Sequence, residues 1–487
     1  MKTNKRPAAS KKAPLKSKSR KPAKPKGVRL LWLVFCLAGV AMISATAGAL
    51  LAVSLASTPL MQRQLSPAEA SIFGKGEKFS SNTNLRLPEL TRPVNILVMG
   101  VKVLTSDLAN PPEEAKNQSY HALVNSFEGL TDTLLLLRFD PEKRKLSVMS
   151  IPRDTRTYIA NHGMTKINEA NYYGGPALSA KSVSELLGGV GIDRYVTINV
   201  QGVEALIEAL GGVTVHVPRD MKYQDDSQHL YINLKAGRQH LNGDQTLQLL
   251  RFRYDENGDI GRIQRQQMVM RALMEQALNP TTVARFPKIL SVIQSHIDTN
   301  LTVEELVALV GFGTQINRSN TKMLMVPGEF SSPGEYIASY WLPSPSKIQA
   351  LMAQHFDFGT SDLKDINPNT LKIAVQDSTE QEKGLQKVME RLKTAGYNNV
   401  YEAKPWTEPL RVTRIVAEWG DISSAEAVRR SLGYGEVRIE NTGDLQSDVT
   451  IQLGKDALQP PKKAASSAKK SAETQQETPR LILPSSD

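Results

Sequence analysis

Apolar runs and apolar periodicity in the first half of the chain predict a mixed α/β domain. Residues 94–99 form a short apolar run closed by Gly100, which is typical of a buried strand. Residues 133–139 and 145–151 are two further apolar runs, and the turn residues 140–143 between them predict a hairpin. Helices are expected over 177–187 and 203–210, and strands over 195–199 and 213–217. The strand–helix–strand order of the last three elements predicts a βαβ unit within the sheet.

The same periodicities predict a mostly helical second half and a separate C-terminal module. A long helix should end near Asn279, with further helices at 286–296, 303–316 and 343–356 and a strand at 322–326. Residues 371–454 repeat strand and helix patterns on a smaller scale. The strands expected there are 372–375, 411–418 and 449–453, and the helices are 384–395 and 423–432.

The N-terminal segment predicts a membrane anchor. Residues 30–55 are apolar or small and uncharged, which is long enough to span a bilayer. The basic residues before it place the N-terminus in the cytoplasm and the rest of the chain outside. A cleaved signal peptide is the alternative, but the apolar run is longer than such peptides usually carry. The only cysteine, Cys36, lies in this span, so no disulfide, cysteine metal site or cysteine nucleophile is expected outside the membrane.

The charge of the chain is concentrated in one tail. The formal net charge is +11, but 12 of the 60 Lys and Arg residues lie within residues 2–29, where there is no acid. The remainder is close to neutral, so nucleic-acid binding by the folded domains is not expected. We therefore divide the chain into a basic cytoplasmic tail (1–29), an anchor (30–55), a stalk (56–92), a main domain (93–358), a linker (359–370), a C-terminal domain (371–455) and a disordered tail (456–487).

Residues 249–267 carry the densest candidate chemistry. Arg251 and Arg253 are two apart, so on an extended stretch they would project to one side. Arg262, Arg265 and Gln266 are three and four apart, so on a helix they would share a face. Arginine binds phosphate through two oxygens at once, and a helix N-terminus attracts anions. The cluster predicts a phosphate site, with an ordinary solvated helix face as the alternative.

Several ordered motifs resemble the LytR–CpsA–Psr family of cell-envelope glycopolymer transferases. They are NILVMG (95–100), TDT (131–133), SIPRDT (150–155), KINEA (166–170), GGVTVHVPRD (211–220), LKAGRQHLNG (234–243) and the arginine run. Residues 371–454 resemble the LytR C-terminal domain. The resemblance implies a mixed-sheet α/β domain with flanking helices that holds a polyprenyl-pyrophosphate-linked glycan, with the lipid in an apolar tunnel. It also implies transfer of the glycan to a peptidoglycan hydroxyl outside the cytoplasmic membrane.

The resemblance also assigns roles to individual residues. Asp132 would bind Mg²⁺, and Asp220 would support the site. Asp154 is a candidate base for the acceptor hydroxyl, or instead an ion-pair partner that orients Arg153. Lys166 and Asn168 would line the site or shape its loop. The implied pyrophosphate ligands are Arg153, Arg251, Arg253, Arg262 and Gln266, and Arg265 belongs to the same cluster.

One position departs from the family pattern. The family usually has an aspartate, a second metal ligand, two residues after the glycine of the first motif, and this chain has Lys102. The metal site loses a carboxylate, or Asp107 replaces it, or the Lys102 ammonium supplies part of the metal's charge. Two other functions stay open. The first is a polyprenyl-pyrophosphate hydrolase that uses water as acceptor. The second is a non-enzymatic membrane-bound regulator that acts through its basic tail.

Overall fold

The computed structural model describes most of the chain beyond the predicted anchor. The described residues are 60–61, 64–74, 78–81, 88–102, 127–225, 230–252, 258–277, 279–316, 320–360, 369–379 and 381–458. Within these ranges, no helix has the length and apolar character needed to cross a bilayer. The predicted cytoplasmic tail, the predicted anchor and Asp107 lie outside them. Of the predicted C-terminal tail, residues 459–487 lie outside them, whereas residues 456–458 belong to a short 3₁₀ helix.

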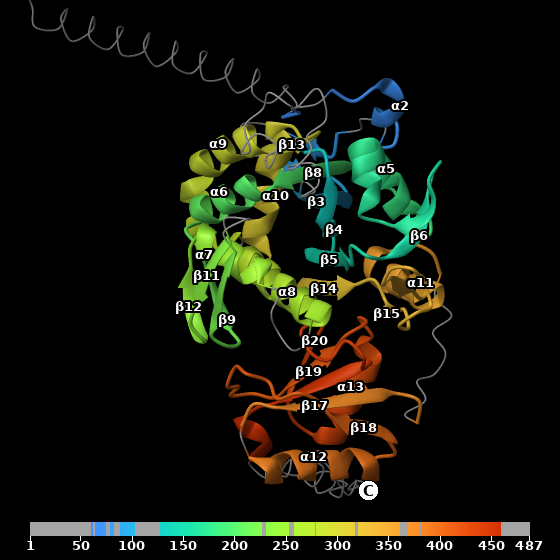
Figure 1. Cartoon of the computed structure of the whole chain (residues 1–487), viewed down its shortest axis with the longest axis vertical. Coiled ribbons are helices and arrows are strands. Elements are labelled where there is room, and N and C mark those ends of the chain that lie inside the picture. Colours follow the sequence, from blue (N-terminus) through green and yellow to red (C-terminus); the bar gives the residue numbers. More distant parts are fainter. Residues whose placement is uncertain are drawn as a thin grey trace, which may run out of the picture. The chain divides into compact units, whose positions relative to one another are not determined.

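A mixed six-stranded sheet forms the centre of the main domain (Figure 1). Its strand order is β13-β8-β3-β4-β5-β14, with parallel pairs β3/β8 and β5/β14 and antiparallel pairs elsewhere. The predicted hairpin is confirmed as β4 and β5. The strands are β3 (Val94–Lys102), β4 (Leu130–Asp140), β5 (Lys145–Ile151), β8 (Arg194–Asn199), β13 (Ile297–Thr299) and β14 (Thr321–Met325).

A β-bulge interrupts the pairing of β3 with β4. Gly100 pairs with Thr133 and Val101 pairs with Thr131, so Asp132 is an extra residue without a partner opposite. A bulge bends its strand and re-aims the side chain it carries, and bulges are common beside active sites. Asp132 therefore leaves the regular alternation of β4, and its side chain is about one third exposed at 35%.

Helices cover both faces of the sheet, because alternate residues of its strands are apolar on both sides (Figure 1). On one face, Leu97, Leu134 and Met149 pack against α5 (Glu169–Leu186) and α11 (Pro345–Phe356). On the other face, Leu135 and Val148 pack against α10 (Val303–Gln315) and α8 (Gly258–Ala277). The site described below lies where α8 meets the ends of β4 and β5.

The predicted βαβ unit is wrong. Strand β8 and helix α6 (Val200–Leu210) form as expected, but β9 (Val213–Val217) pairs with β12 (Gly237–Leu241) in a separate two-stranded sheet. Another ribbon, of β10 (Met221–Asp225) and β11 (Leu230–Leu234), joins the same apolar cluster. That cluster packs under α6, α7 (Gly243–Arg251) and α8. The apolar run 213–217 thus has a core of its own and does not extend the central sheet.

Segment α5 consists of two helical stretches that meet at a kink. Gly174 and Gly175 have non-helical backbone angles, with Gly175 at φ +63°, and the stretch after them matches the helix predicted over 177–187. The short stretch before the kink, which begins at Glu169, was not predicted. Asn168 is its N-cap residue and lies behind the site.

A buried ion pair fixes α10 against the sheet. Arg194 on β8 donates from Nη2 and Nε to the two carboxylate oxygens of Glu305, at 2.6 and 3.2 Å. Their side chains are only 7% and 2% exposed. Glu305 also completes a capping box with Thr302 at the start of α10. Helix α9 (Phe286–His296) precedes β13 and packs on α6.

Short elements complete the main domain. The ribbon of β6 (Arg156–Ile159) and β7 (Gly163–Lys166) leads into α5, and the ribbon of β15 (Gly328–Phe330) and β16 (Trp341–Pro343) precedes α11. Neither ribbon was predicted, because each strand has only three or four residues. The remaining elements are α2 (Pro67–Ala70), β1 (Ser80–Ser81), β2 (Glu89–Leu90) and the 3₁₀ helix η4 (Pro280–Arg285).

The C-terminal module is an α/β unit with its own core, as predicted. Its five-stranded sheet has the order β18-β17-β21-β19-β20. Helices α12 (Glu382–Thr394) and α13 (Ile422–Leu432) pack on it through Leu392, Val428 and Leu432. The other elements are β17 (Lys372–Asp377), β18 (Asn399–Glu402), β19 (Arg414–Ala417), β20 (Glu436–Arg438), β21 (Val449–Leu453) and the 3₁₀ helix η6 (Lys455–Leu458).

Candidate active site

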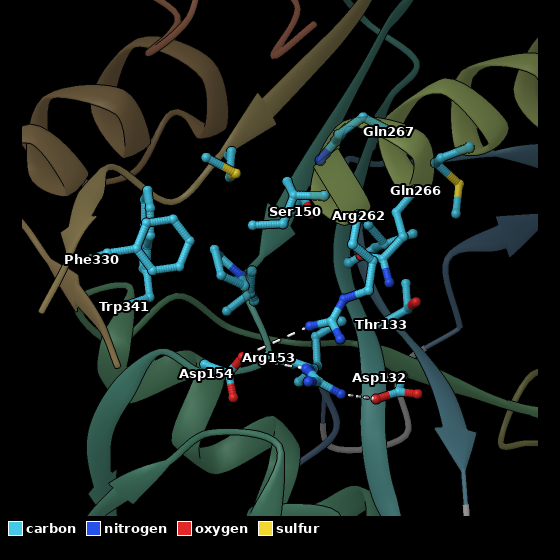
Figure 2. Close-up of a pocket in the computed structure, with 17 residues that line it drawn as sticks. Asp132, Thr133, Ser150, Arg153, Asp154, Arg262, Gln266, Gln267, Phe330 and Trp341 are labelled. Atoms are coloured by element: carbon cyan, nitrogen blue, oxygen red, sulfur yellow. Dashed lines mark hydrogen bonds and ion pairs between the residues drawn. The ribbon is translucent and has the colours of Figure 1, made fainter. Parts of the chain in front are cut away.

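A pocket opens where β4, the end of β5 and the first turns of α8 meet (Figure 2). Asp132 comes from the bulge of β4, and Arg153 and Asp154 follow β5 directly. Arg262 and Gln266 come from α8, more than one hundred residues later in the chain. The predicted convergence of Arg153 with the 251–266 segment therefore holds for the part of that segment that lines the pocket.

Arg153 lies between two carboxylates. Its Nη1 donates to Oδ1 of Asp132 at 2.6 Å, and its Nε donates to Oδ2 of Asp154 at 3.3 Å (Figure 2). These two bonds hold the arginine side chain in place, and because the side chain is 26% exposed it can still be reached from the pocket. A fixed, charged guanidinium of this kind can bind a phosphate without first losing the entropy of a mobile side chain.

Asp154 is the centre of the positive cluster. Its Oδ1 accepts a hydrogen bond from Nζ of Lys166 at 2.8 Å, and its Oδ2 is 4.0 Å from Nη2 of Arg262. With Arg153 this makes three cations around one carboxylate. The arrangement favours the orienting role for Asp154, because a carboxylate already engaged by three cations holds them against their mutual repulsion.

Of the predicted phosphate-binding residues on helix α8, two line the pocket and one does not. Arg262 and Gln266 are four apart and line the pocket together. Arg265 is placed elsewhere than predicted: it is 3% exposed and donates from Nε to the carbonyl of Leu249 at 3.2 Å and from Nη2 to that of Phe252. Successive helical residues turn by about 100°, so Arg265 and Gln266 point in different directions. Arg265 joins the C-terminal end of α7 to α8.

Three other predicted residues lie at the ends of described segments or beyond them. Arg251 is the last residue of α7 and is partly exposed, so it is helical and not extended as predicted. Arg253 lies outside the described residues. Lys102 is the last residue of β3, and its backbone pairs with Leu130, two residues before Asp132. The side chain of Lys102 is not among those described.

Asp220 does not reach the pocket. It follows β9, its side chain is 60% exposed, and it accepts hydrogen bonds from Nζ of Lys235 at 2.9 Å and from the backbone N–H of Ala236 at 2.8 Å. The hydrogen bond from Lys235, followed by that from Ala236, lowers the pKa of Asp220 below its usual value. These bonds join the start of β10 to the link between β11 and β12, so in this structure Asp220 closes the end of the β10–β11 ribbon and is not the supporting acid of the pocket that was predicted.

Asn168 lies behind the site, and aromatic residues that the prediction missed lie beside it. The backbone of Asn168 donates to the carbonyl of Arg153 at 3.2 Å, and its own carbonyl accepts from the N–H of Thr131 at 3.2 Å. It thereby ties the loop after β5 to the bulged strand. Phe330 and Trp341 line the pocket on the side of Asp154 (Figure 2). The sequence did not predict these two residues, because the β15–β16 ribbon that carries them is too short to predict.

The pocket lining is apolar further along β4 and α8. Leu135 and Met270 form a wall there, and Met270 also packs with the cluster of Leu135, Phe312 and Ile316 between the sheet and α10. A second pocket beyond this cluster is lined in part by Met274, one turn further along α8. Methionine side chains are flexible and repack readily.

The described acids around the pocket suit a metal ion held mainly by substrate. Within the described residues there is no group of three or more His, Cys, Asp or Glu side chains that could enclose a metal ion. Asp132 offers one partly exposed carboxylate, and Asp154 is engaged by cations. Mg²⁺ commonly uses one or two carboxylates with substrate phosphate oxygens and water, so this donor set fits a substrate-dependent magnesium site.

Comparison with known proteins identifies the class. The LytR_cpsA_psr family matches residues 61–356, and residues 370–456 match the domain described as LytR cell envelope-related transcriptional attenuator. The chain belongs to the LytR–CpsA–Psr family. It is 30% identical to the polyisoprenyl-teichoic acid–peptidoglycan teichoic acid transferase TagU of Bacillus cereus, over 56% of this chain and 81% of that one.

Two further similarities are with TagV of Bacillus subtilis. The sequence of that polyisoprenyl-teichoic acid–peptidoglycan teichoic acid transferase is 29% identical to this chain, over 52% of this chain and 68% of TagV. The crystal structure of B. subtilis TagV aligns with a TM-score of 0.45 and 28% identity, covering 55% of this chain and 99% of that one.

Proposed function

We propose that this protein transfers a glycopolymer from a polyprenyl-pyrophosphate carrier to a hydroxyl of peptidoglycan. The observation that carries the proposal is the pocket in which Arg153, Arg262 and Gln266 face one another, with an apolar wall at one end. A phosphate site beside an apolar wall matches a ligand that is charged at its head and greasy in its tail. The relatives named as teichoic acid transferases support the same reaction class.

In the proposed reaction, the acceptor oxygen attacks the phosphorus that carries the glycan. A new phosphodiester bond forms, the bond from that phosphorus to the bridging oxygen breaks, and polyprenyl phosphate leaves. The hydroxyl proton passes to a base or to water. Charge on the phosphate oxygens is spread in the transition state, so the catalytic task is positioning and neutralisation. Arg153 and Arg262 would bind the non-bridging oxygens, and Gln266 would donate a hydrogen bond.

Asp154 has an orienting role in this proposal. It is held by Lys166 at 2.8 Å and by Arg153 at 3.3 Å, so it keeps both cations at the pocket before substrate arrives. Arrival of the pyrophosphate supplies a new anion for these cations.

Asp132 is the residue that would hold Mg²⁺ in the loaded enzyme. The ion would supply a Lewis acid that polarises the phosphoryl oxygens and neutralises the leaving group. The pyrophosphate and water would complete its coordination. The bulge turns the Asp132 side chain out of the strand alternation and leaves it accessible, which suits a ligand that must meet the substrate.

The lipid tail would enter the apolar cluster between Met270 and Met274. This cluster lies between the sheet and helices α8 and α10, and the pocket and the second pocket adjoin it on two sides. The anchor proposed for residues 30–55 would hold the domain on the outer side of the cytoplasmic membrane, where both the carrier and peptidoglycan are found.

The test is transfer of a labelled glycan from a defined polyprenyl-pyrophosphate donor to peptidoglycan by the full chain in membranes. Arg153→Lys and Arg262→Lys keep the charge but lose the planar fork, and each should reduce transfer by about 100-fold or more. Arg238→Lys, at an exposed position of β12, is the matched control and should be unchanged. Full transfer by the double variant Arg153→Ala with Arg262→Ala would refute the proposal.

The same assay separates the two remaining functions. A hydrolase would release the glycan phosphate into water with no label on peptidoglycan. A non-enzymatic regulator would show no transfer and would lose its cellular effect on deletion of residues 2–26, whereas a transferase with the same deletion would keep its transfer activity. Label covalently bound to peptidoglycan supports the transferase and excludes hydrolysis as the sole activity.

A further inference from the structure

The β6–β7 ribbon presents an unusual outward face. Arg156 pairs with Lys166 and Tyr158 pairs with Met164, so these four side chains lie on one side of the ribbon. Tyr158 is 54% exposed and Met164 is 49% exposed, whereas the alternate residues Thr157 and Ile159 are buried. Large side chains exposed side by side next to two cations are uncommon on a surface that contacts only water.

Two tyrosines from the β15–β16 connection extend this face. The guanidinium of Arg156 lies 5.0 Å from the ring centre of Tyr336 and 5.9 Å from that of Tyr340. The ammonium of Lys166 lies 5.7 Å from the Tyr340 ring. These are cation–π distances, so the rings and the cations hold one another in place. We call Arg156, Tyr158, Met164, Lys166, Tyr336 and Tyr340 the aromatic strip.

The aromatic strip is joined to the proposed active site. Lys166 donates to Asp154 at 2.8 Å, so one end of the strip is the carboxylate that organises the pocket cations. Main-chain bonds hold the two parts in register: the N–H of Trp341 donates to the carbonyl of Asp154 at 2.9 Å, and Thr155 forms a parallel bridge with Trp341. Side-chain and main-chain hydrogen bonds therefore join the strip to the site.

We infer that the aromatic strip binds the acceptor glycan strand and guides its hydroxyl to the phosphorus. A pyranose ring has a face of C–H groups that packs on a tyrosine ring, and its hydroxyl and amide edges suit the hydrogen-bonding cations and the phenol groups. Carboxylates on the peptides of peptidoglycan would match the charges of Arg156 and Lys166. The inference rests on the proposed transfer to peptidoglycan and adds the surface that selects its acceptor.

The geometry of attack on phosphorus favours the acceptor glycan, and not the donor's own sugars, as the ligand of the aromatic strip. Attack on phosphorus is roughly in line with the leaving group, so the acceptor must approach from the side opposite the lipid phosphate. We place the lipid at Leu135 and Met270, which lie further along β4 and α8 than Asp132 and Arg262. Asp154 and Trp341 line the same pocket and are joined by a main-chain hydrogen bond, and there the strip begins (Figure 2).

The test measures acceptor and donor binding separately on the full chain in detergent. The acceptor probe is a soluble peptidoglycan tetrasaccharide, and the donor probe is a polyprenyl-pyrophosphate disaccharide. Tyr158→Ala with Tyr336→Ala should weaken tetrasaccharide binding by about fivefold or more and leave donor binding unchanged, because two stacking surfaces are lost and no phosphate ligand is. Tyr158→Phe keeps the ring and should bind like the wild type.

Tyr231→Ala is the matched control, since Tyr231 on β11 is also 54% exposed and lies outside the strip. Equal tetrasaccharide affinity of this control and the double variant would overturn the inference, as would an equal loss of donor and acceptor binding in the double variant. Failure of the proposed function looks different: the wild type would bind the tetrasaccharide, with the double variant weaker, but would transfer no label to peptidoglycan.

Discussion

The guanidinium of Arg153 lies 2.6 Å from the carboxylate of Asp132, so the proposed phosphate ligand and the proposed metal ligand neutralise each other before substrate arrives. Neither charge is left uncompensated in the resting site. Loading the site must separate them, because the arginine is then needed by the phosphate and the carboxylate by the metal. Removal of either partner should therefore change how the other responds to its ligand.

Asp132→Asn should reduce transfer by about 100-fold and abolish its dependence on Mg²⁺, because the amide keeps the shape of the carboxylate but lacks the charge that binds the ion. Single-turnover transfer measured over a magnesium titration, with and without a chelator, tests this. Glu142→Gln, at an exposed turn position, is the control for loss of one acid. A normal magnesium response in Asp132→Asn would remove Asp132 as the metal ligand.

Asp154→Asn should mainly weaken donor binding, by about tenfold, because the cations at Arg153, Lys166 and Arg262 lose the anion that holds them together. The shape of the pH profile of kcat should then stay as in the wild type. If Asp154 is instead the obligatory base, kcat should fall by about 10²–10⁴-fold with donor binding intact. Donor affinity and the pH profile of kcat, measured on the same preparation, distinguish the two roles.

Met274→Arg should impair long-chain donors selectively. The side chain of Met274 packs with the apolar cluster between the sheet and α10, and a charge there is costly to bury. Donors with a full polyprenyl chain should lose affinity, whereas donors truncated to a few isoprene units should bind as before. The chain-length comparison within one variant is the control, and an equal loss for both donors would show that the tail takes another route.

Glu305→Ala should destabilise the main domain by about 3–5 kcal/mol, because it leaves the buried Arg194 guanidinium without its bidentate partner. Urea unfolding followed by tryptophan fluorescence measures the change. A joint replacement, Arg194→Met with Glu305→Leu, removes both charges and should recover most of the lost stability. A loss below about 1 kcal/mol in Glu305→Ala would mean that water reaches the pair.

The stability of the C-terminal module should depend on pH because of Glu418, the residue that follows β19. It is fully buried, and burial raises the pKa of its carboxyl well above the ordinary 4.5. The folded module therefore keeps a proton that the unfolded chain releases. Its free energy of unfolding should fall as pH rises above about 4.5, by up to about 1.4 kcal/mol per pH unit until the folded pKa is reached.

Glu418→Gln mimics the protonated carboxyl and should flatten this dependence. Thermal unfolding of the full chain, followed over a pH series, provides the measurement. The variant should be at least as stable as the wild type at neutral pH, and the two should converge in acid. A wild-type module whose stability rises with pH over this range would contradict the assignment.

Sequence patterns predicted the elements whose signal is local. The hairpin of β4 and β5, helix α9 and the C-terminal strand–helix alternation follow from apolar periodicity and turn residues, and they formed where expected. The run 213–217 was also a strand, but its partner is a matter of tertiary packing: it found β12 and a separate apolar cluster. Periodicity reports that a face is buried, and it does not report which neighbour buries it.

The residues of the site likewise divide into those that local sequence patterns predicted and those whose place depends on tertiary packing. Arg153, Arg262 and Gln266 were predicted from motif and spacing and meet in one pocket, because each follows a well-signalled element. Arg265 was assigned by spacing alone, and one helical step was enough to turn it onto the carbonyls of Leu249 and Phe252. Tyr336 and Tyr340 were not predicted, because they lie in the connection of the short β15–β16 ribbon, which joins the site only through the bridge between Thr155 and Trp341.

The bulge in β4 has a consequence for how this protein tolerates change. Thr131 and Thr133 both have partners on β3, and the residue between them is surplus to the ladder. A chain shortened by deletion of Asp132 could therefore keep every cross-strand pair of β3 and β4 while losing the acid. The position that carries the acid is thus the one that the pairing of β3 and β4 does not need.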